Sequence, residues 1–198
     1  MDDPGQNSSA SQIIDALRGS VHGLNLTVPE DAKATIKPWN ERESTEKFAE
    51  SNVDDQLVIH IPFAENVRIK SVLLKLGRGE TTPRRLRIYA NRTNIIDFSE
   101  IDEVQPSLNI SLLEGETGVT EYPLRMAAFA SINALSLFFS DSVGEESTWV
   151  YYIGFKGETK TIRKEGSNKI EIPAATAADA SLTDRLREKG SARQPTAK

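Results

Sequence analysis

Hydrophobic and polar residues alternate through the middle of the chain. In QLVIHIPF (56–63), Leu57, Ile59 and Ile61 fall on one side and His60 falls on the other. A period of two residues is typical of a β-strand with one buried face. The pattern therefore predicts a strand here, with His60 as a half-buried neighbour of polar side chains on the outer face.

The same alternation, together with stretches rich in β-forming residues, predicts more strands. They cover residues 67–76, 85–90, 108–113, 124–130, 132–139 and 148–156, and a last hairpin is expected at 159–163 and 168–172. Turn residues separate the strands at 62–66, 77–79, 115–118 and 141–144. Because no long helical period interrupts this region, we expect an all-β antiparallel sandwich or barrel.

The two ends of the chain have a different pattern. Residues 1–10 are polar and are expected to be disordered, residues 11–18 could form a short helix, and residues 11–55 form an irregular arm. Trp39 is isolated in this polar arm, and we expect it to pack on the body as an anchor. The sandwich then occupies residues 56–172. The tail, residues 173–198, is expected to be flexible, with a transient helix at 181–189.

Composition narrows the chemistry. The chain has 198 residues, of which 38% are hydrophobic and 27% are charged, with no cysteine and only two histidines. The absence of cysteine excludes disulfides, thiolate metal sites and thiol catalysis. No apolar run reaches about 18 residues, and the first residues lack the pattern of a signal peptide. We therefore expect a soluble intracellular protein of one domain with tails.

Charge is unevenly distributed around a formal total of −5. Residues 1–55 carry −6, residues 56–172 carry −1 and residues 173–198 carry +2. Nucleic-acid binding requires a concentrated positive field. A nearly neutral body therefore argues against nucleic acid as a partner, and nothing in the sequence predicts membrane binding.

No catalytic, cofactor or metal site is predicted. The chain has no GxSxG motif, and the glycines at 77–79 lack the spacing of a phosphate loop. Pairs of carboxylates fall in predicted loops, where solvated charge is the default. These pairs are Asp54/Asp55, Asp102/Glu103, Glu114/Glu116 and Glu145/Glu146. The sequence therefore predicts a protein that is not an enzyme.

Arginines gather in one region of the predicted sandwich. They are Arg78, Arg84, Arg85, Arg87 and Arg92. Alternation places Arg85 and Arg87 on the outward face of one strand. Two interpretations remain open: a solvated face balanced by neighbouring acids, or a docking patch for an acidic protein surface, because arginine is favoured at interfaces.

Several segments together resemble the PITH domain, the proteasome-interacting thioredoxin domain. They are SNVDDQLVIHIPF (51–63), VRIKSVLLKL (67–76), RRLRIYANR (84–92), the Asp97-Phe98 pair and EYPLRMAAFASINALSLFFSDSVGEESTWVYYIGFKGE (121–158). The resemblance runs from about residue 12 to residue 172, so the PITH domain is expected at 11–172. It is a set order of strands and loops, without a catalytic signature.

This resemblance implies a jelly-roll sandwich similar to galactose-binding modules. It also implies association with the regulatory particle of the 26S proteasome, in the cytoplasm and nucleus. The thioredoxin domain that some relatives carry is missing here, so the chain resembles a stand-alone, non-redox member, and we expect a monomer. The expected contact residues are the Arg78–Arg92 group and the loop from Asp141 to Thr148, which includes Glu145 and Glu146.

An alternative function is the binding of a small carbohydrate-like ligand at one end of the sandwich. Such a site usually stacks an aromatic ring on the ligand. Trp149 and Tyr151 are available, but their place in a strand rich in β-formers predicts that they pack in the core.

Overall fold

The structure is a computed structural model, and it describes residues 21–125 and 127–159. These residues belong to the first of two units, Met1–Thr161, and the second, Ile162–Lys198, lies outside the described residues. All strand pairings in the described part are antiparallel. The elements are β1 (His22–Leu24), α2 (Asp31–Ala34), η1 (Trp39–Glu41), β2 (Ala49–Glu50), β3 (Leu57–Leu76), η2 (Gly79–Thr81), β4 (Pro83–Ala90), α3 (Phe98–Ile101), β5 (Leu108–Ser111), β6 (Thr120–Pro123), β7 (Ile132–Ser142) and β8 (Trp149–Thr159).

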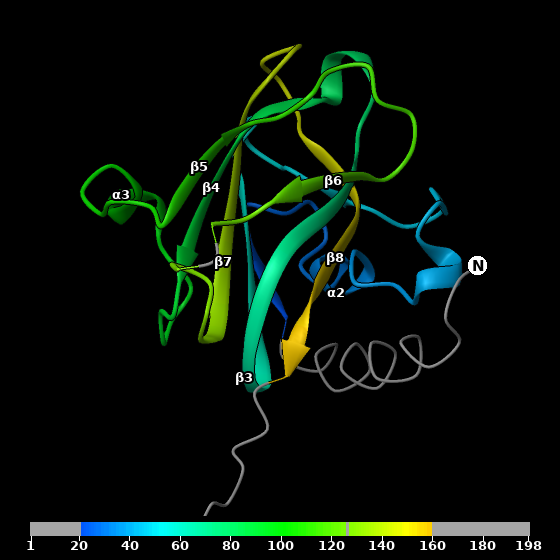
Figure 1. The fold of residues 1–198 in the computed structure, drawn as a ribbon. Helices are drawn as coiled ribbons and strands as arrows, with labels where there is room; N and C mark the ends of the chain where they lie inside the picture. Colours follow the sequence, from blue (N-terminus) through cyan, green and yellow to red (C-terminus); the bar gives the residue numbers. More distant parts are fainter. Residues whose placement is uncertain (1–20, 126, 160–198) are drawn as a thin grey trace, which may run out of the picture. The chain divides into compact units, whose positions relative to one another are not determined.

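One long strand, β3, belongs to both layers of the sandwich (Figure 1). Its first half pairs with β1 and β7, and its second half pairs with β6 and β8. The register with β7 shifts between Pro62 and Val67, where the strand bends. The predicted turn at 62–66 is therefore wrong. Residues such as Pro62 and Glu65 occur in a bend of a strand as well as in a turn. Here β3 bends and continues in the same direction instead of reversing.

The core lies between the two layers. Leu57, Ile59, Leu137 and Phe139 project into it from β3 and β7 and are fully buried. They meet side chains of the other layer, among them Val72, Leu74 and Val150. The inward residues of the alternation are thus confirmed as core, but Val58 and His60 on the outward side of β3 are buried too, so burial on one face alone is wrong for this strand.

A second, smaller apolar cluster covers the outer face of β3, β7 and β4. Val58, Tyr89 and Phe138 lie on this face, and Ile96 and Ile101 from the β4–β5 connection cover them. The connection contains α3, which begins with a capping box. The N-cap residue is Asp97, whose side chain accepts a hydrogen bond from the Ser99 amide at 3.0 Å. The Glu100 side chain in turn accepts a hydrogen bond from the Asp97 amide at 3.2 Å. The outer face of this layer is therefore partly buried.

The arm wraps two buried lysines. Lys37 Nζ donates to the carbonyls of Ser44 and Lys47 at 2.8 and 2.7 Å, and Lys75 Nζ contacts Glu43 Oε2 at 2.6 Å. The arm also supplies β1 and β2, which the sequence pattern did not predict. Trp39 does not anchor it: its side chain is 38% exposed and Arg42 stacks on its ring. That prediction is wrong, because the arm is held to the sandwich by the Lys75–Glu43 contact and by the pairing of β1 with β3 and of β2 with β8.

The predicted strand at 124–130 is also wrong, because its described residues form a turn. The strand of this region is β6 (Thr120–Pro123), which ends just before the predicted segment. Leu124 and Phe129 are nevertheless buried, which explains the apolar pattern. The helices expected at 11–18 and 181–189, the hairpin at 159–172, and the disordered N-terminus and tail lie at or beyond the limits of the described residues. No helix within 21–125 or 127–159 is long and apolar enough to cross a membrane.

Candidate functional site

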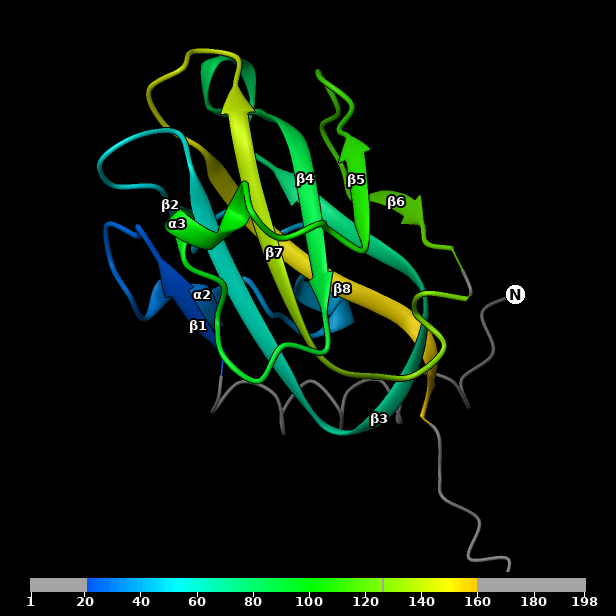
Figure 2. The ribbon, with the colours of Figure 1, turned by 90° about the vertical axis from the view of Figure 1, so that its left-hand side faces the viewer.

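Four loops meet at one end of the strands, and we call this the loop end (Figure 2). They are residues 51–56, 77–82, 112–119 and 141–148. Because binding residues are often carried by loops on a rigid scaffold, this end is the first candidate for a functional site.

Hydrogen bonds fix the loops of this end to one another. Asp55 Oδ2 accepts from the Ser142 amide at 2.6 Å, and Thr148 Oγ1 donates to the Asp55 carbonyl at 2.6 Å. The Val143 amide donates to the Thr82 carbonyl at 3.0 Å. Arg78 of the 77–82 loop donates to the Thr117 carbonyl at 3.1 Å, so the fourth loop is also tied to this surface.

Asn25 fixes the 51–56 loop from outside it. Its backbone has a positive φ of 56°, which asparagine tolerates better than most residues. Its side-chain Nδ2 donates to Asp54 Oδ1 at 2.7 Å and to the Gln56 carbonyl at 2.6 Å. Its Oδ1 accepts from the Val53 amide at 3.0 Å. One side chain thus satisfies three polar groups of the loop.

The 141–148 loop contains two residues with a left-handed backbone, of which aspartate tolerates the conformation better than glutamate. Asp141 and Glu145 have φ values of 58° and 60°, in the left-handed region that favours glycine. The hydroxyls of Ser142 and Ser147 are buried without a hydrogen-bond partner. Strained backbone and unsatisfied polar groups are costly, and they concentrate at functional sites.

The structure brings five of the seven predicted contact residues to the loop end. Arg78, Glu145 and Glu146 lie in its loops, Arg84 and Arg85 lie at the adjoining start of β4, and all five are exposed. Arg84 Nε donates to the Asp141 carbonyl at 3.0 Å, and Arg85 lies 3.6 Å from the Asp141 carboxylate.

Arg87 and Arg92 lie elsewhere and have their own partners. Arg87 pairs with Asp102 at 3.2 Å and stands over the ring of Phe138. Arg92 pairs with Glu100 at 3.0 Å. Both carboxylates come from the connection that covers the second cluster, so these two arginines hold that connection in place. The five arginines do not form one patch.

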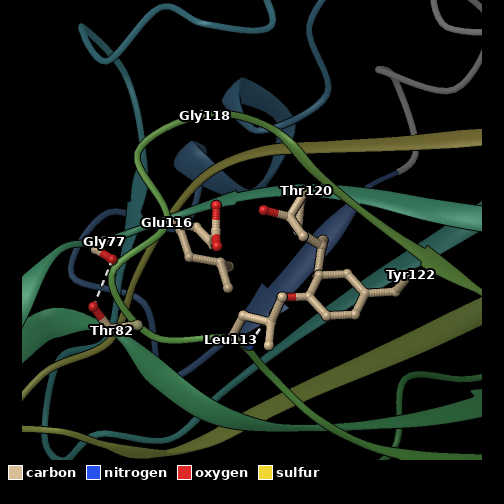
Figure 3. Close-up of a pocket in the computed structure, with 9 residues that line it drawn as sticks. Gly77, Thr82, Leu113, Glu116, Gly118, Thr120 and Tyr122 are labelled. Carbon is tan, nitrogen blue, oxygen red and sulfur yellow. Dashed lines mark hydrogen bonds between the residues drawn. The ribbon is translucent and has the colours of Figure 1, made fainter.

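A small pocket opens beside the loop end. It is lined by Leu76, Thr82, Leu113, Glu116 and Tyr122, among others (Figure 3). Its volume is about 10 Å³, which is about the space of one water molecule. A sugar ring does not fit in it.

Trp149 and Tyr151 lie on the outer side of β8, half-buried, so the prediction that they pack in the core is wrong. Their rings pack on Phe48, with centroids 4.6 and 5.3 Å away. Trp149 Nε1 donates to Glu50 Oε1 at 3.0 Å. The arm residue Phe48 could not be predicted from the sequence as their partner, because it lies about a hundred residues away.

The one Ser–His contact of the described residues is buried. His60 Nδ1 lies 2.8 Å from Ser136 Oγ, but the two residues are 4% and 0% exposed. Burial, and to a smaller extent the charge of His22 on the neighbouring strand, lowers the pKa of His60. A buried neutral imidazole beside a fully buried serine has no access to a substrate. His60 is more deeply buried than the half-buried position predicted for it.

The acidic pairs do not assemble a metal site. Among the described residues, no group of three or more histidine, aspartate or glutamate side chains could hold a metal ion. The pairs instead stay on separate loops, or serve local contacts such as that of Asp55 with the Ser142 amide.

Sequence reasoning missed three exposed apolar residues at the loop end. Val53 is 83% exposed, Leu113 is 54% exposed and Val143 is 38% exposed. A single apolar residue in a loop gives no signal in the sequence. Only the fold shows that three such residues share one end.

Residues 2–174 of this chain match the family model of the PITH domain. The chain is 30% identical over 168 residues to PITH domain-containing protein 1 of Dictyostelium discoideum, covering 85% of this chain and 82% of that protein. It is 31% identical over 141 residues to PITH domain-containing protein 1 of Homo sapiens, covering 71% and 66%. It therefore spans slightly less than two thirds of the length of some relatives.

Among solved structures, the C-terminal domain of a chitobiase from Bacteroides fragilis is similar in fold. Its TM-score is 0.52 at 14% identity, covering 70% of this chain and 92% of that domain. At this identity the likeness concerns the fold alone. The described residues thus form a jelly-roll β-sandwich similar in fold to that domain, as the family resemblance implied.

Proposed function

The chain belongs to the PITH domain family, and from this we propose that it is a non-catalytic module that docks on the regulatory particle of the 26S proteasome as an adaptor or accessory factor. Family membership supports a proteasome-related role in protein binding. The observation that carries the proposal on this chain is the loop end, where hydrogen bonds join loops 51–56, 77–82 and 141–148 and Arg78 donates to the Thr117 carbonyl of the fourth loop.

The rigidity of this surface favours protein binding. Loops that are fixed before binding lose little conformational entropy when a partner docks. The surface also carries Arg84 and Arg85, and arginine is enriched at protein interfaces.

The chemistry of the described residues favours binding over catalysis. His60 and Ser136 are enclosed, and the acidic pairs stay on separate loops. The pocket beside the loop end holds about one water molecule, so it gives no support to the carbohydrate alternative. We propose that the protein acts as a monomer in the cytoplasm and nucleus, where proteasomes lie.

Binding to purified 26S proteasomes tests this function. The full chain, mixed with 26S particles and separated by size-exclusion chromatography, is expected to elute with them. The 20S core particle alone is the control, and it is expected to leave the chain in the low-mass fractions. The proposal is contradicted if the chain elutes equally with both particles. It is also contradicted if the chain, at tens of micromolar, elutes with neither.

A further inference from the structure

Exposed apolar side chains concentrate at the loop end. The described residues hold five exposed large hydrophobic side chains, and three of them, Val53, Leu113 and Val143, lie here. Isolated exposed apolar residues are normal, whereas several on one surface mark an interaction site. The loop end therefore offers apolar contacts as well as polar ones.

Contacts between the loops place the three residues on one surface. The loop of Val53 is joined to β7 through Asp55 and the Ser142 amide. The Val143 amide donates to the Thr82 carbonyl, and Thr82 and Leu113 line the same pocket (Figure 3).

Carboxylates share the loop end with these apolar side chains. The charged residues of the loop end are Asp54, Asp55, Glu80, Glu114, Glu116, Asp141, Glu145, Glu146 and Arg78, and Arg84 and Arg85 adjoin it at the start of β4. Eight carboxylates against three guanidinium groups give a formal charge of −5 for this end. Arg84 and Arg85 are already engaged at Asp141, and Arg78 donates to the Thr117 carbonyl at 3.1 Å.

The electrostatic field at the loop end is therefore negative, despite the arginines there. A partner with an acidic surface, which the arginines alone suggested, is disfavoured by like charge. Nucleic acids and anionic membranes are disfavoured for the same reason.

We propose that the loop end binds a basic, partly apolar segment of a partner protein. Its lysine or arginine side chains meet the carboxylates, and its apolar side chains meet Val53, Leu113 and Val143. This inference rests on the proposed function and specifies the chemistry of the partner. The carboxylates speed association and set its salt dependence, while apolar burial holds the complex together.

A pair of matched charge reversals tests the inference. The first variant is E145K/E146K, at the loop end. The second is E65K/E103K, which makes the same change in net charge at two exposed sites, in the bend of β3 and just after α3. Circular dichroism checks that both variants are folded.

The probe is a short fluorescent peptide of alternating lysine and leucine, followed by anisotropy with the full chain. We expect E145K/E146K to raise the Kd at least about tenfold and E65K/E103K to raise it less than about twofold, because nearby charges interact most strongly. Added salt is expected to weaken binding of the unaltered chain. A peptide of alternating glutamate and leucine is expected not to bind.

Each of the following results overturns the inference: no binding of the lysine peptide, equal loss in both variants, or equal binding of the glutamate peptide. A synthetic peptide of residues 173–198 that displaces the lysine peptide also overturns it, because the occupant is then the chain's own tail.

The proteasome assay separates the two proposals. If E145K/E146K still elutes with 26S particles as the unaltered chain does, this inference fails and the proposed function stands. If the unaltered chain binds the lysine peptide in the expected pattern but not the proteasome, the proposed function fails and the basic-segment site stands.

Discussion

Replacing Leu137 with alanine is expected to lower the free energy of unfolding by about 2–5 kcal/mol. Leu137 is fully buried in the middle of β7, between the two layers of the sandwich. On β3 it lies opposite Ile59, and on β4 it lies opposite Ile88. Removal of its side chain leaves a cavity among close-packed neighbours, and β-strands that are paired on both sides cannot easily move to fill it.

Urea denaturation followed by circular dichroism measures this loss. Leu113→Ala is the matched control: the chemical change is the same, but the side chain is 54% exposed. We expect the control to change stability by no more than about 0.5 kcal/mol. Similar losses for the two variants would show that Leu137 does not lie in the core.

The second large effect is expected at Asn25. Asn25→Ala is expected to cost roughly 2–4 kcal/mol, because it removes three side-chain hydrogen bonds and puts alanine at a positive φ. The bonds lost are those to Asp54, Gln56 and Val53. Hydrogen exchange at the Val53 amide is expected to become faster, since that amide loses its acceptor.

Asn25→Gly separates the two causes. Glycine loses the same hydrogen bonds but adopts φ of 56° without strain. The glycine variant is therefore expected to be about 1 kcal/mol more stable than the alanine variant, while exchange at Val53 is equally fast in both. Equal stability of the two variants would contradict the assignment of backbone strain to this position.

The alternation of apolar residues predicted most of the sandwich, because a two-residue period directly reports one buried face. Ile59 and Leu137 were assigned to the core on this basis, and both are there. The pattern could not show that β3 continues through 62–66, since a bend and a turn use the same residues. It also misplaced the strand near Tyr122, because buried turn residues such as Phe129 are as apolar as a strand.

The candidate site was harder to predict than the fold. The sequence places Arg85 near Arg87, but the structure pairs the first with Asp141 and the second with Asp102. These partners are distant in sequence, and no local pattern reveals them. The same is true of Asn25, whose role depends on a loop about thirty residues away. The net charge of a site depends on which charged residues the fold brings together, whereas the sequence shows only which charged residues are neighbours along the chain.

The most direct test of the account is to find which face of the chain touches the proteasome. A photo-crosslinking amino acid is placed at Val53 in one sample and at Glu65 in another, and each chain is irradiated with 26S particles. Mass spectrometry then identifies the linked subunits. We predict links from position 53 to subunits of the regulatory particle and none from position 65. Links from position 65 alone, or links only to the core particle, would contradict the account.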